Sequence, residues 1–434
     1  MTQNFILEMK NNIINTSPSI FLFEYLSCGG MLNQPISEEL LAEGFSMLSS
    51  LIKDFHLLYF NINLIIDSKL KFKLNKLIED LAPEPLINVI FLDNSSNFNQ
   101  EFEKSIINSE FILIIAPEFQ NILYNFVKKA ELIIKEYPEK KMLNPSSVSI
   151  SIFSDKILTE ISLNKDRFIF PSSFSLDQFI GHYEELKMIK SSLKFPEEKI
   201  QYFFIKPVDG AGALDTFELE IDFSTFILNS DLIIEELKAL KNLLNKNFPN
   251  QNFIIQNKIE GIPLSISAIA IDGEISFLII NSQILKSEPY SFDTDFKYLK
   301  LKKISYAGGE TPYTELPSDV ELYLFSKVKW LLYKYKISGF IGIDFIYTQK
   351  EFVINNQETN IFFIEVNPRI TTPYIALSEI FRQENLNLAM YFFEGIFIQP
   401  NERKLGSLIF DYHAVFQKDE IEKEISVKIS KNIL

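Results

Sequence analysis

The chain has 434 residues, which is too long for one ordinary hydrophobic core and predicts two or three domains. Its net charge of −15 argues against nucleic acid or an anionic membrane as the main partner. No apolar run reaches the length that spans a membrane, and the single cysteine, Cys28, fits a reducing compartment, so we expect a cytoplasmic protein.

Strand and helix patterns alternate along the first third of the chain. After a polar lead-in at residues 1–17, apolar runs predict strands at residues 19–25, 56–60, 87–92 and 111–116. Amphipathic patterns predict helices that begin at Ser37 and cover residues 70–81, 98–107 and 119–136. This alternation predicts a parallel, doubly wound α/β sheet, and residues 137–147 predict a linker after it.

A first candidate ligand site lies at the end of the first predicted strand. Open α/β sheets bind ligands beyond the carboxyl ends of their strands, and Glu24 lies there, shortly before Gly29 and Gly30. The segment lacks a full G-x-G-x-x-G pattern, so a dinucleotide site is poorly supported. A plain loop that needs positive φ at glycine is the alternative.

A second group of features indicates a phosphate site. Lys156 follows Ser154-Asp155 at a predicted helix start, and a strand at residues 202–205 leads into Lys206-Pro207-Val208-Asp209-Gly210-Ala211-Gly212-Ala213. Small residues leave backbone amides free to surround a phosphate, and a neighbouring lysine neutralises its charge. Because the lysine precedes the glycines, the segment is not a P-loop, and a flexible hairpin tip is the alternative.

The middle of the chain predicts a helix at residues 232–245, a strand at 253–256 and a hairpin. The two hairpin strands, 264–271 and 274–280, flank the two-residue turn Asp272-Gly273. Residues 281–314 show neither period, so we expect irregular structure there, followed by a helix at residues 319–335.

Three oxygen-bearing side chains stand in two further strand patterns, at residues 339–347 and 361–367. Glu365 and Asn367 share one face of the second strand, because side chains alternate along a strand. Antiparallel pairing places Asp344 of the first strand opposite them, and two buried carboxylates side by side call for a cation. Mg²⁺ is the expected ion because it binds carboxylates together with phosphates, and a strand end with a solvated polar tip is the alternative.

Taken in order, these motifs resemble the ATP-grasp carboxylate–amine ligases over residues 18–400. They are Lys-Pro with its glycine loop, a strand that ends in Gln-Asn-Lys-Ile-Glu-Gly, and Asp344 with Glu-x-Asn-Pro-Arg. The resemblance implies an N-terminal, doubly wound pre-ATP-grasp domain at residues 18–147, followed by a two-lobed α+β ATP-grasp fold. It further implies a central lobe with the glycine loop at residues 148–263, a C-terminal lobe with the metal site at 264–400, and an extension at 401–434.

The resemblance also implies roles for single residues. Asp344, Glu365 and Asn367 match the ligands of Mg²⁺, with Mn²⁺ as an alternative ion. Lys206 matches a lysine that touches the ATP phosphates, and the planar guanidinium of Arg369 suits a transferring phosphate or a substrate carboxylate, so we expect both residues to be catalytic. The implied ATP-binding residues are Lys156, Lys206, Asp209, Gly210, Ala211, Gly212, Ala213, Gln256, Asn257, Lys258, Ile259 and Glu260.

Finer cues resemble one subgroup, the tyramine–glutamate ligases of methanofuran biosynthesis. They include Phe23-Glu24-Tyr25 with Gly29-Gly30, and Tyr306-Ala307-Gly308-Gly309. The subgroup implies an ADP-forming acid–amine ligase that joins L-glutamate to tyramine through an acylphosphate. The implied substrate-binding residues are Glu24, Gly29, Gly30, Glu43, Gly308 and Gly309.

Two other functions stay open at this point. The same fold can join two amino acids, or another amine and carboxylate. An ATP-binding module without turnover is the second alternative, although a complete set of three metal ligands disfavours it. The expected partners are a small-molecule carboxylate and amine, and a homo-oligomer is left open.

Overall fold

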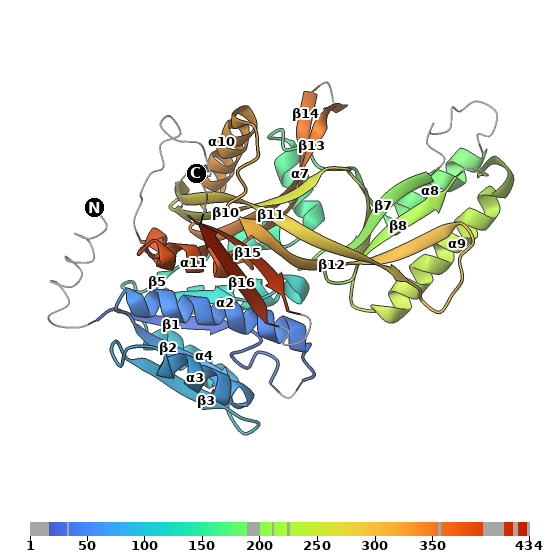
Figure 1. Cartoon of the computed structure of the whole chain (residues 1–434). Helices are drawn as coiled ribbons and strands as arrows, with labels where there is room; N and C mark the ends of the chain where they lie inside the picture. Colours follow the sequence, from blue (N-terminus) through green and yellow to red (C-terminus); the bar gives the residue numbers. More distant parts are fainter. Residues whose placement is uncertain are drawn as a thin grey trace.

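The computed structural model is built on two β-sheets with helices packed against them (Figure 1). The predicted lead-in lies almost entirely outside the described residues, and so does much of the predicted extension. The structure describes residues 17–32, 34–188, 200–210, 212–223, 226–354, 357–393, 412–419 and 424–431.

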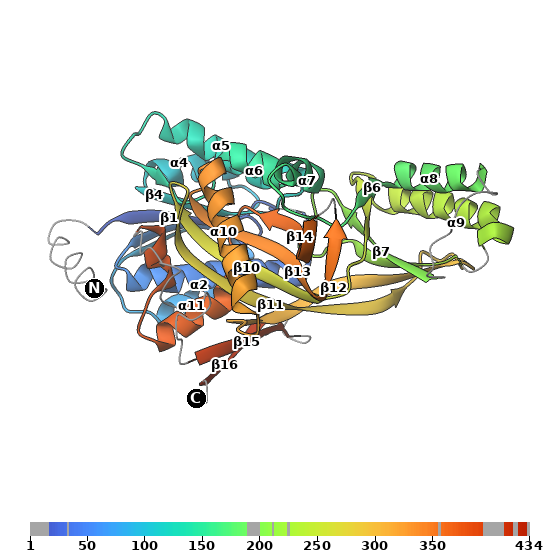
Figure 2. The same ribbon diagram turned by 90° about the horizontal axis from the view of Figure 1, so that it is seen from above.

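The first sheet is parallel and has five strands in the order β3-β2-β1-β4-β5. Helix α2 (Glu38–Leu57) covers one face, and α4 (Phe98–Ile107) and α5 (Ile122–Ile134) cover the other (Figure 2). This arrangement confirms the predicted doubly wound α/β sheet. The remaining elements are β1 (Ser19–Glu24), β2 (Asn61–Asp67), β3 (Ile87–Leu92), β4 (Phe111–Ile115), β5 (Lys141–Met142) and α3 (Lys71–Glu79).

The strand predicted at residues 56–60 is wrong. Helix α2 continues to Leu57, and β2 begins only at Asn61. Phe55, Leu58 and Phe60 are buried in the core of the first sheet, so this apolar run forms the end of α2 and the turn after it. An apolar run of this length fits a buried helix end as well as a strand, and the packing decides between them.

The second sheet has 11 strands and all of its pairs are antiparallel. Its main path runs β14-β13-β10-β11-β12-β8-β7-β9-β6, and β15 and β16 branch from β12. Its strands are β6 (Ser173–Ser175), β7 (Ile200–Pro207), β8 (Thr216–Asp222), β9 (Phe253–Asn257), β10 (Ile262–Ile271), β11 (Glu274–Tyr290), β12 (Leu299–Thr311), β13 (Gly339–Ile354), β14 (Gln357–Asn367), β15 (Tyr412–Lys418) and β16 (Ile425–Lys431).

The hairpin predicted around Asp272-Gly273 is confirmed as β10 and β11. The irregular structure predicted at residues 281–314 is wrong for most of that segment, because β11 continues to Tyr290 and pairs with β12. Residues 284–289 are all exposed, so no alternation of apolar and polar residues marks them as a strand. Backbone pairing with β12 builds this part of the sheet.

Three hydrophobic cores hold these layers together. One lies between α8 (Leu176–Met188), α9 (Phe226–Asn247) and the sheet at β7 to β9, and the second between α10 (Ser318–Tyr335) and the sheet at β10 to β14. The third joins the first sheet to α11 (Pro373–Gln383) and the turn η3 (Leu388–Phe392). The chain thus returns to the first sheet after β14, and the domain boundaries stay predictions. Helices α6 (Ser147–Phe153) and α7 (Lys156–Asn164) follow the first sheet in the chain and contact β14. The other short turns are η1 (Ser68–Leu70) and η2 (Phe119–Asn121).

No helix within the described ranges is long and apolar enough to cross a membrane.

A buried polar network fastens α11 to α2. The Asp54 carboxylate is fully buried and accepts hydrogen bonds from Tyr374 Oη (2.9 Å) and Ser378 Oγ (2.7 Å). Arg382 forms an ion pair with the same carboxylate, and Asn387 Nδ2 donates to the Asp54 carbonyl at 2.7 Å. A buried carboxylate with this set of partners is tolerated only while its countercharge is present.

We expect Arg382→Met to lower the free energy of unfolding by about 3–5 kcal/mol, because it leaves Asp54 charged, buried and unpaired. Urea denaturation measures the change. The matched control is Lys53→Met, which breaks the half-exposed Lys53–Glu379 pair (3.8 Å) and costs no more than about 1 kcal/mol. A loss below about 1 kcal/mol for Arg382→Met would contradict this account of the network.

Candidate functional site

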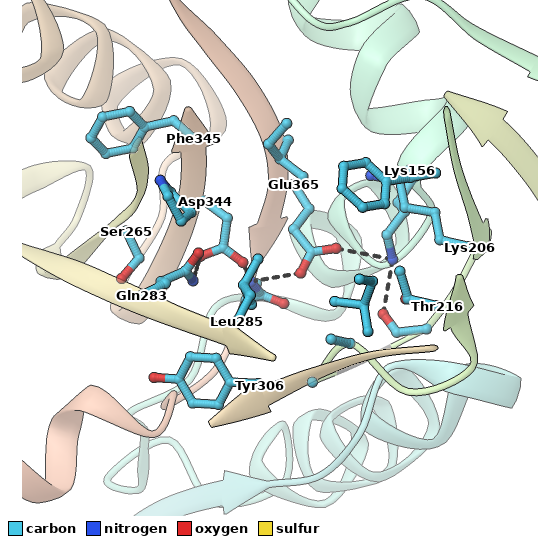
Figure 3. A pocket seen from close by; sticks show the side chains of 18 of the residues that line it. Lys156, Lys206, Thr216, Ser265, Gln283, Leu285, Tyr306, Asp344, Phe345 and Glu365 are labelled. Carbon is cyan, nitrogen blue, oxygen red and sulfur yellow. Dashed lines mark hydrogen bonds and ion pairs between the residues drawn. The ribbon is translucent and has the colours of Figure 1, made fainter. Parts of the chain in front are cut away.

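One pocket collects residues from the second sheet, from the loops beside it and from α2, α7 and α11 (Figure 3). Of the residues predicted from the sequence, it is lined by Glu43, Lys156, Lys206, Gly210, Gly212, Ala213, Gln256, Asn257, Ile259, Asp344, Glu365, Asn367 and Arg369. Glu24, Gly29, Gly30, Asp209, Lys258, Glu260, Gly308 and Gly309 are described by the structure but do not line it. Ala211 lies outside the described residues.

Two carboxylates from neighbouring strands form the centre of the pocket. The antiparallel register of β13 and β14 pairs Asp344 with Glu365, and Gly342 with Asn367, which confirms the predicted strand pairing. Asn367 Nδ2 donates to Asp344 Oδ2 (3.2 Å) and lies 3.4 Å from Glu365 Oε1. Gln283 Nε2 on β11 donates to Asp344 Oδ1 at 3.0 Å.

The two carboxyl groups have opposite pKa shifts. Burial and the neighbouring Glu365 raise the pKa of Asp344 well above its usual range. Burial also raises the pKa of Glu365, but the ammonium groups of Lys156 and Lys206 outweigh this effect and lower it. A cation at this place would offset the repulsion that acts on Asp344.

The donor set fits Mg²⁺ bound together with a phosphate ligand. In the described part of the chain, no three acidic, histidine or cysteine side chains gather into a metal centre. Asp344, Glu365 and the Asn367 amide oxygen make only three donors. Mg²⁺ is commonly held by one or two carboxylates, with phosphate oxygens and waters as its remaining ligands.

Two lysines stand beside the carboxylates. Lys156 is the first residue of α7, whose N-cap Asp155 accepts a hydrogen bond from Leu158 N. Its Nζ lies 3.0 Å from Glu365 Oε2 and donates to the Gly210 carbonyl at 2.9 Å. Lys206, near the end of β7, is 7% exposed, and burial together with the charge of Lys156 lowers its pKa to about 8. These ammonium groups are placed to meet phosphate charge.

The glycine loop between β7 and β8 borders the lysines. Gly212 (φ 62°) and Ala213 (φ 59°) adopt the left-handed conformation, and a side chain at Gly212 would meet no atom within 4 Å. The loop thus has an open face towards the pocket. Asp209 points elsewhere, because its Oδ2 accepts a hydrogen bond from Gln120 N of the first domain at 3.0 Å.

The ATP-binding residues predicted at positions 256–260 divide between the pocket and the surface. Gln256 is buried and donates to Ser173 Oγ at 2.8 Å, and Asn257 and Ile259 line the pocket beside it. Lys258 instead pairs with Glu218 (3.1 Å) and Glu260 (3.0 Å). The Glu260 side chain is 81% exposed and does not line the pocket.

Arg369 reaches the pocket from the segment after β14. Its Nε lies 2.8 Å from Glu118 Oε1, and its Nη1 donates to the Ile370 carbonyl at 3.1 Å. Both side chains of the pair are almost fully buried, so Glu118 holds the Arg369 guanidinium in place. The sequence analysis did not identify Glu118, because a lone acid before a helix carries no motif.

The two acids proposed for the substrate lie in different surroundings. Glu43 of α2 lines the pocket, whereas Glu24 is 3% exposed. The Glu24 carboxylate accepts hydrogen bonds from Ser27 N (2.8 Å) and Ser27 Oγ (2.6 Å), so it braces the turn after β1. A Cβ at Gly44 would lie 2.5 Å from this carboxyl carbon, which shows how tightly the group is enclosed.

Gly308 and Gly309 on β12 face a neighbouring strand. A Cβ at Gly308 (φ 139°) would lie 2.0 Å from the carbonyl oxygen of Phe416 on β15. A Cβ at Gly309 would lie 2.2 Å from the carbonyl oxygen of Ser282 on β11. Close packing of strands accounts for both glycines.

Comparison with known proteins places this fold and pocket in one family. Residues 153–373 match the family model of the ATP-grasp domain. Tyramine–L-glutamate ligases of Methanocaldococcus jannaschii and Methanocaldococcus fervens are each 25% identical to the chain, over 362 and 361 residues. These matches cover 82% of this chain, and 84% and 89% of the two relatives.

Two solved structures share the fold. A protein of the ATP-grasp superfamily from Archaeoglobus fulgidus superimposes with a TM-score of 0.55 at 20% identity, over 96% of this chain and 100% of that one. The biotin carboxylase domain of the Hydrogenobacter thermophilus 2-oxoglutarate carboxylase, in complex with MgADP, superimposes with a TM-score of 0.56 at 12% identity, over 93% of this chain and 75% of that one.

The chain belongs to the ATP-grasp family. The matched segment begins before Lys156 and ends after Arg369, so it contains the whole group of lysines, carboxylates and arginine described above. The family resemblance inferred from the motifs is thereby confirmed.

We expect Glu365→Gln to lower kcat by at least about 100-fold while the fold is retained, because a carboxylate that would bind the metal is lost. ADP release measures activity, and circular dichroism verifies the fold. The control is Glu358→Gln, an exposed acid on the same strand. Near-normal activity of Glu365→Gln at low Mg²⁺ would rule out its role as a metal ligand.

We expect Lys206→Ala to weaken MgATP binding by roughly 10–100-fold and amine binding much less, since its charge acts on phosphate. Titration calorimetry with each ligand measures both effects. The control is Lys300→Ala, which removes an exposed lysine paired with Glu220 on the sheet surface. Equal losses for ATP and amine would contradict a phosphate role for Lys206.

Proposed function

We propose that this ATP-grasp enzyme is an ATP-dependent ligase that joins an amine to a carboxylate and releases ADP and phosphate. The observation that carries the proposal is the group formed by Lys156, Lys206, Asp344, Glu365 and Asn367 at one end of the pocket. It combines charges for phosphate with ligands for a metal ion, as phosphoryl transfer requires.

The proposed chemistry runs in two steps. A carboxylate is a poor acyl donor at neutral pH, so an oxygen of the substrate carboxylate first takes the γ-phosphoryl group and gives an acylphosphate. The amine nitrogen then attacks the carbonyl carbon, the bond from that carbon to the phosphate oxygen breaks, and phosphate leaves while the nitrogen loses a proton. Asp344, Glu365 and Asn367 would hold a Mg²⁺ ion, which would neutralise phosphate charge during transfer.

Side chains of this protein have separate tasks in these steps. Lys156 and Lys206 would bind and orient the phosphates, and the backbone amides of the glycine loop would hold the γ-phosphoryl group. Arg369, fixed by Glu118 at 2.8 Å, would hold the substrate carboxylate and then the charge of the acylphosphate.

We further propose L-glutamate as the carboxylate and tyramine as the amine. The support is the similarity to two tyramine–L-glutamate ligases over 82% of this chain, together with Glu43 on the pocket wall. The alternative is an enzyme of the same family that joins two amino acids or another amine and carboxylate. A binding module without turnover is disfavoured by the paired carboxylates beside two lysines.

We expect ADP and phosphate release to depend on both L-glutamate and tyramine, and phenethylamine to be a poorer acceptor by a factor of about 10⁴. A site that hydrogen-bonds a hydroxyl discriminates strongly against the analogue that lacks it. The measurement is kcat/KM across a panel of amines and amino acids, with reactions lacking glutamate as the control. Amino acids that outcompete tyramine would overturn the substrate assignment, and ATP binding without product release would favour the binding module.

A further inference from the structure

The C-terminal hairpin of β15 and β16 forms the outer side of one pocket wall. β15 pairs with β12 in antiparallel register, from Gly308 with Gln417 to Thr311 with Ala414. The hairpin lies beside β12 and α2 in Figure 1. Its Phe416 packs so closely that β12 must carry Gly308 there, as described above. The pairing therefore places the end of β15 beside the pocket.

Lys418, the last residue of β15, extends from the hairpin to the pocket. Its Nζ lies 2.7 Å from Glu43 Oε2 on α2 and 6.0 Å from the centre of the Tyr306 ring on β12. The Thr372 hydroxyl donates to the other oxygen of Glu43. Glu43, Tyr306 and Thr372 all line the pocket. Three separate segments of the chain thus meet at the Glu43 carboxylate, and Tyr306 of β12 stands beside Lys418.

This part of the pocket lies away from the phosphate-binding part. Figure 3 shows Tyr306 on the opposite side of the pocket from Lys206. The predicted ATP-binding residues Gln256 and Asn257 belong to β9, which pairs with β7, the strand that carries Lys206. The end of the pocket beside Glu43 is therefore available to a substrate other than the nucleotide.

The charge and hydrogen-bond capacity at Glu43 point to a particular kind of group. A carboxylate can accept about four hydrogen bonds, and Thr372 and Lys418 provide two donors. Lys418 already balances the negative charge, so a second cation would gain little Coulomb energy there. A neutral hydroxyl gains a hydrogen bond to a charged acceptor without needing a countercharge.

We propose that the C-terminal hairpin completes the acceptor end of the pocket, and that Lys418 is a positioning residue that holds Glu43 to accept a hydrogen bond from the hydroxyl of a hydroxylated amine. This inference rests on the proposed ligase function. It gives β15 and β16 a task in substrate binding, in addition to their place in the sheet.

The test compares Lys418→Met with the wild-type enzyme. We expect the KM for tyramine to rise about 5–30-fold, since 1–2 kcal/mol corresponds to that factor, while the KM for ATP stays within about twofold. Lys418→Arg should restore most of the loss, because it keeps the charge. The control is Lys428→Met, which removes an exposed lysine from β16 of the same hairpin and should change neither constant.

A double-mutant cycle with Glu43→Gln shows whether Lys418 acts through Glu43. In the Glu43→Gln background, Lys418→Met should add less than about twofold to the KM for tyramine. Lys418→Met should also reduce the preference for tyramine over phenethylamine. If the hairpin only stabilised the fold, this preference would stay unchanged.

The outcomes separate the two proposals. If the wild-type enzyme turns over tyramine and Lys418→Met leaves the KM for tyramine unchanged, the hairpin inference is overturned and the proposed function stands. An equal rise in the KM values for tyramine and ATP overturns it as well, because the effect is then on the whole structure. Wild-type enzyme that releases no ADP with any amine refutes the proposed function and this inference with it.

Discussion

The active-site geometry depends on the repulsion between two buried carboxylates. Asp344 and Glu365 face each other across β13 and β14, where burial alone would favour protonation of both. Lys156 and Lys206 supply the positive charge that keeps Glu365 ionised. Because these lysines come from the start of α7 and the end of β7, the need for countercharge brings three distant parts of the chain to one place. Lys156 also binds the carbonyl of Gly210, so the same charge fixes one end of the glycine loop.

Strand β12 connects the two ends of the pocket. It pairs with β8 of the lobe that carries the glycine loop, with β11 of the lobe that carries the carboxylates, and with β15 of the C-terminal hairpin. Its Tyr306 lines the pocket, and its Gly308 allows β15 to approach. Because one strand has these three partners, the sheet rather than the loops fixes the distance between the two ends of the pocket that we propose for the nucleotide and the amine.

Local sequence patterns were sufficient for the parts of the site that lie on one hairpin or one loop. Asp344 and Glu365 were predictable because side-chain alternation and hairpin pairing fix their register. The contact between Glu43 and Lys418 was not predictable, because the two residues lie at opposite ends of the chain and no local period relates them. Gly308 was selected through the subgroup resemblance, whereas the structure shows that β12 needs a glycine there because the backbone of Phe416 lies so close. That packing was not predictable either, because Phe416 lies more than 100 residues later in the chain.

The first domain also takes part in the arrangement of the catalytic groups, through the turn that precedes α5. Glu118 pairs with Arg369, and two residues later the amide of Gln120 donates to Asp209 at the base of the glycine loop. Gln120 has a positive φ of 53°, which non-glycine residues adopt only with support from their surroundings. The turn therefore contacts one group proposed to stabilise the acylphosphate and another beside the ATP phosphates. Because the turn contacts both groups, a shift of the turn would move Arg369 and the start of the glycine loop together.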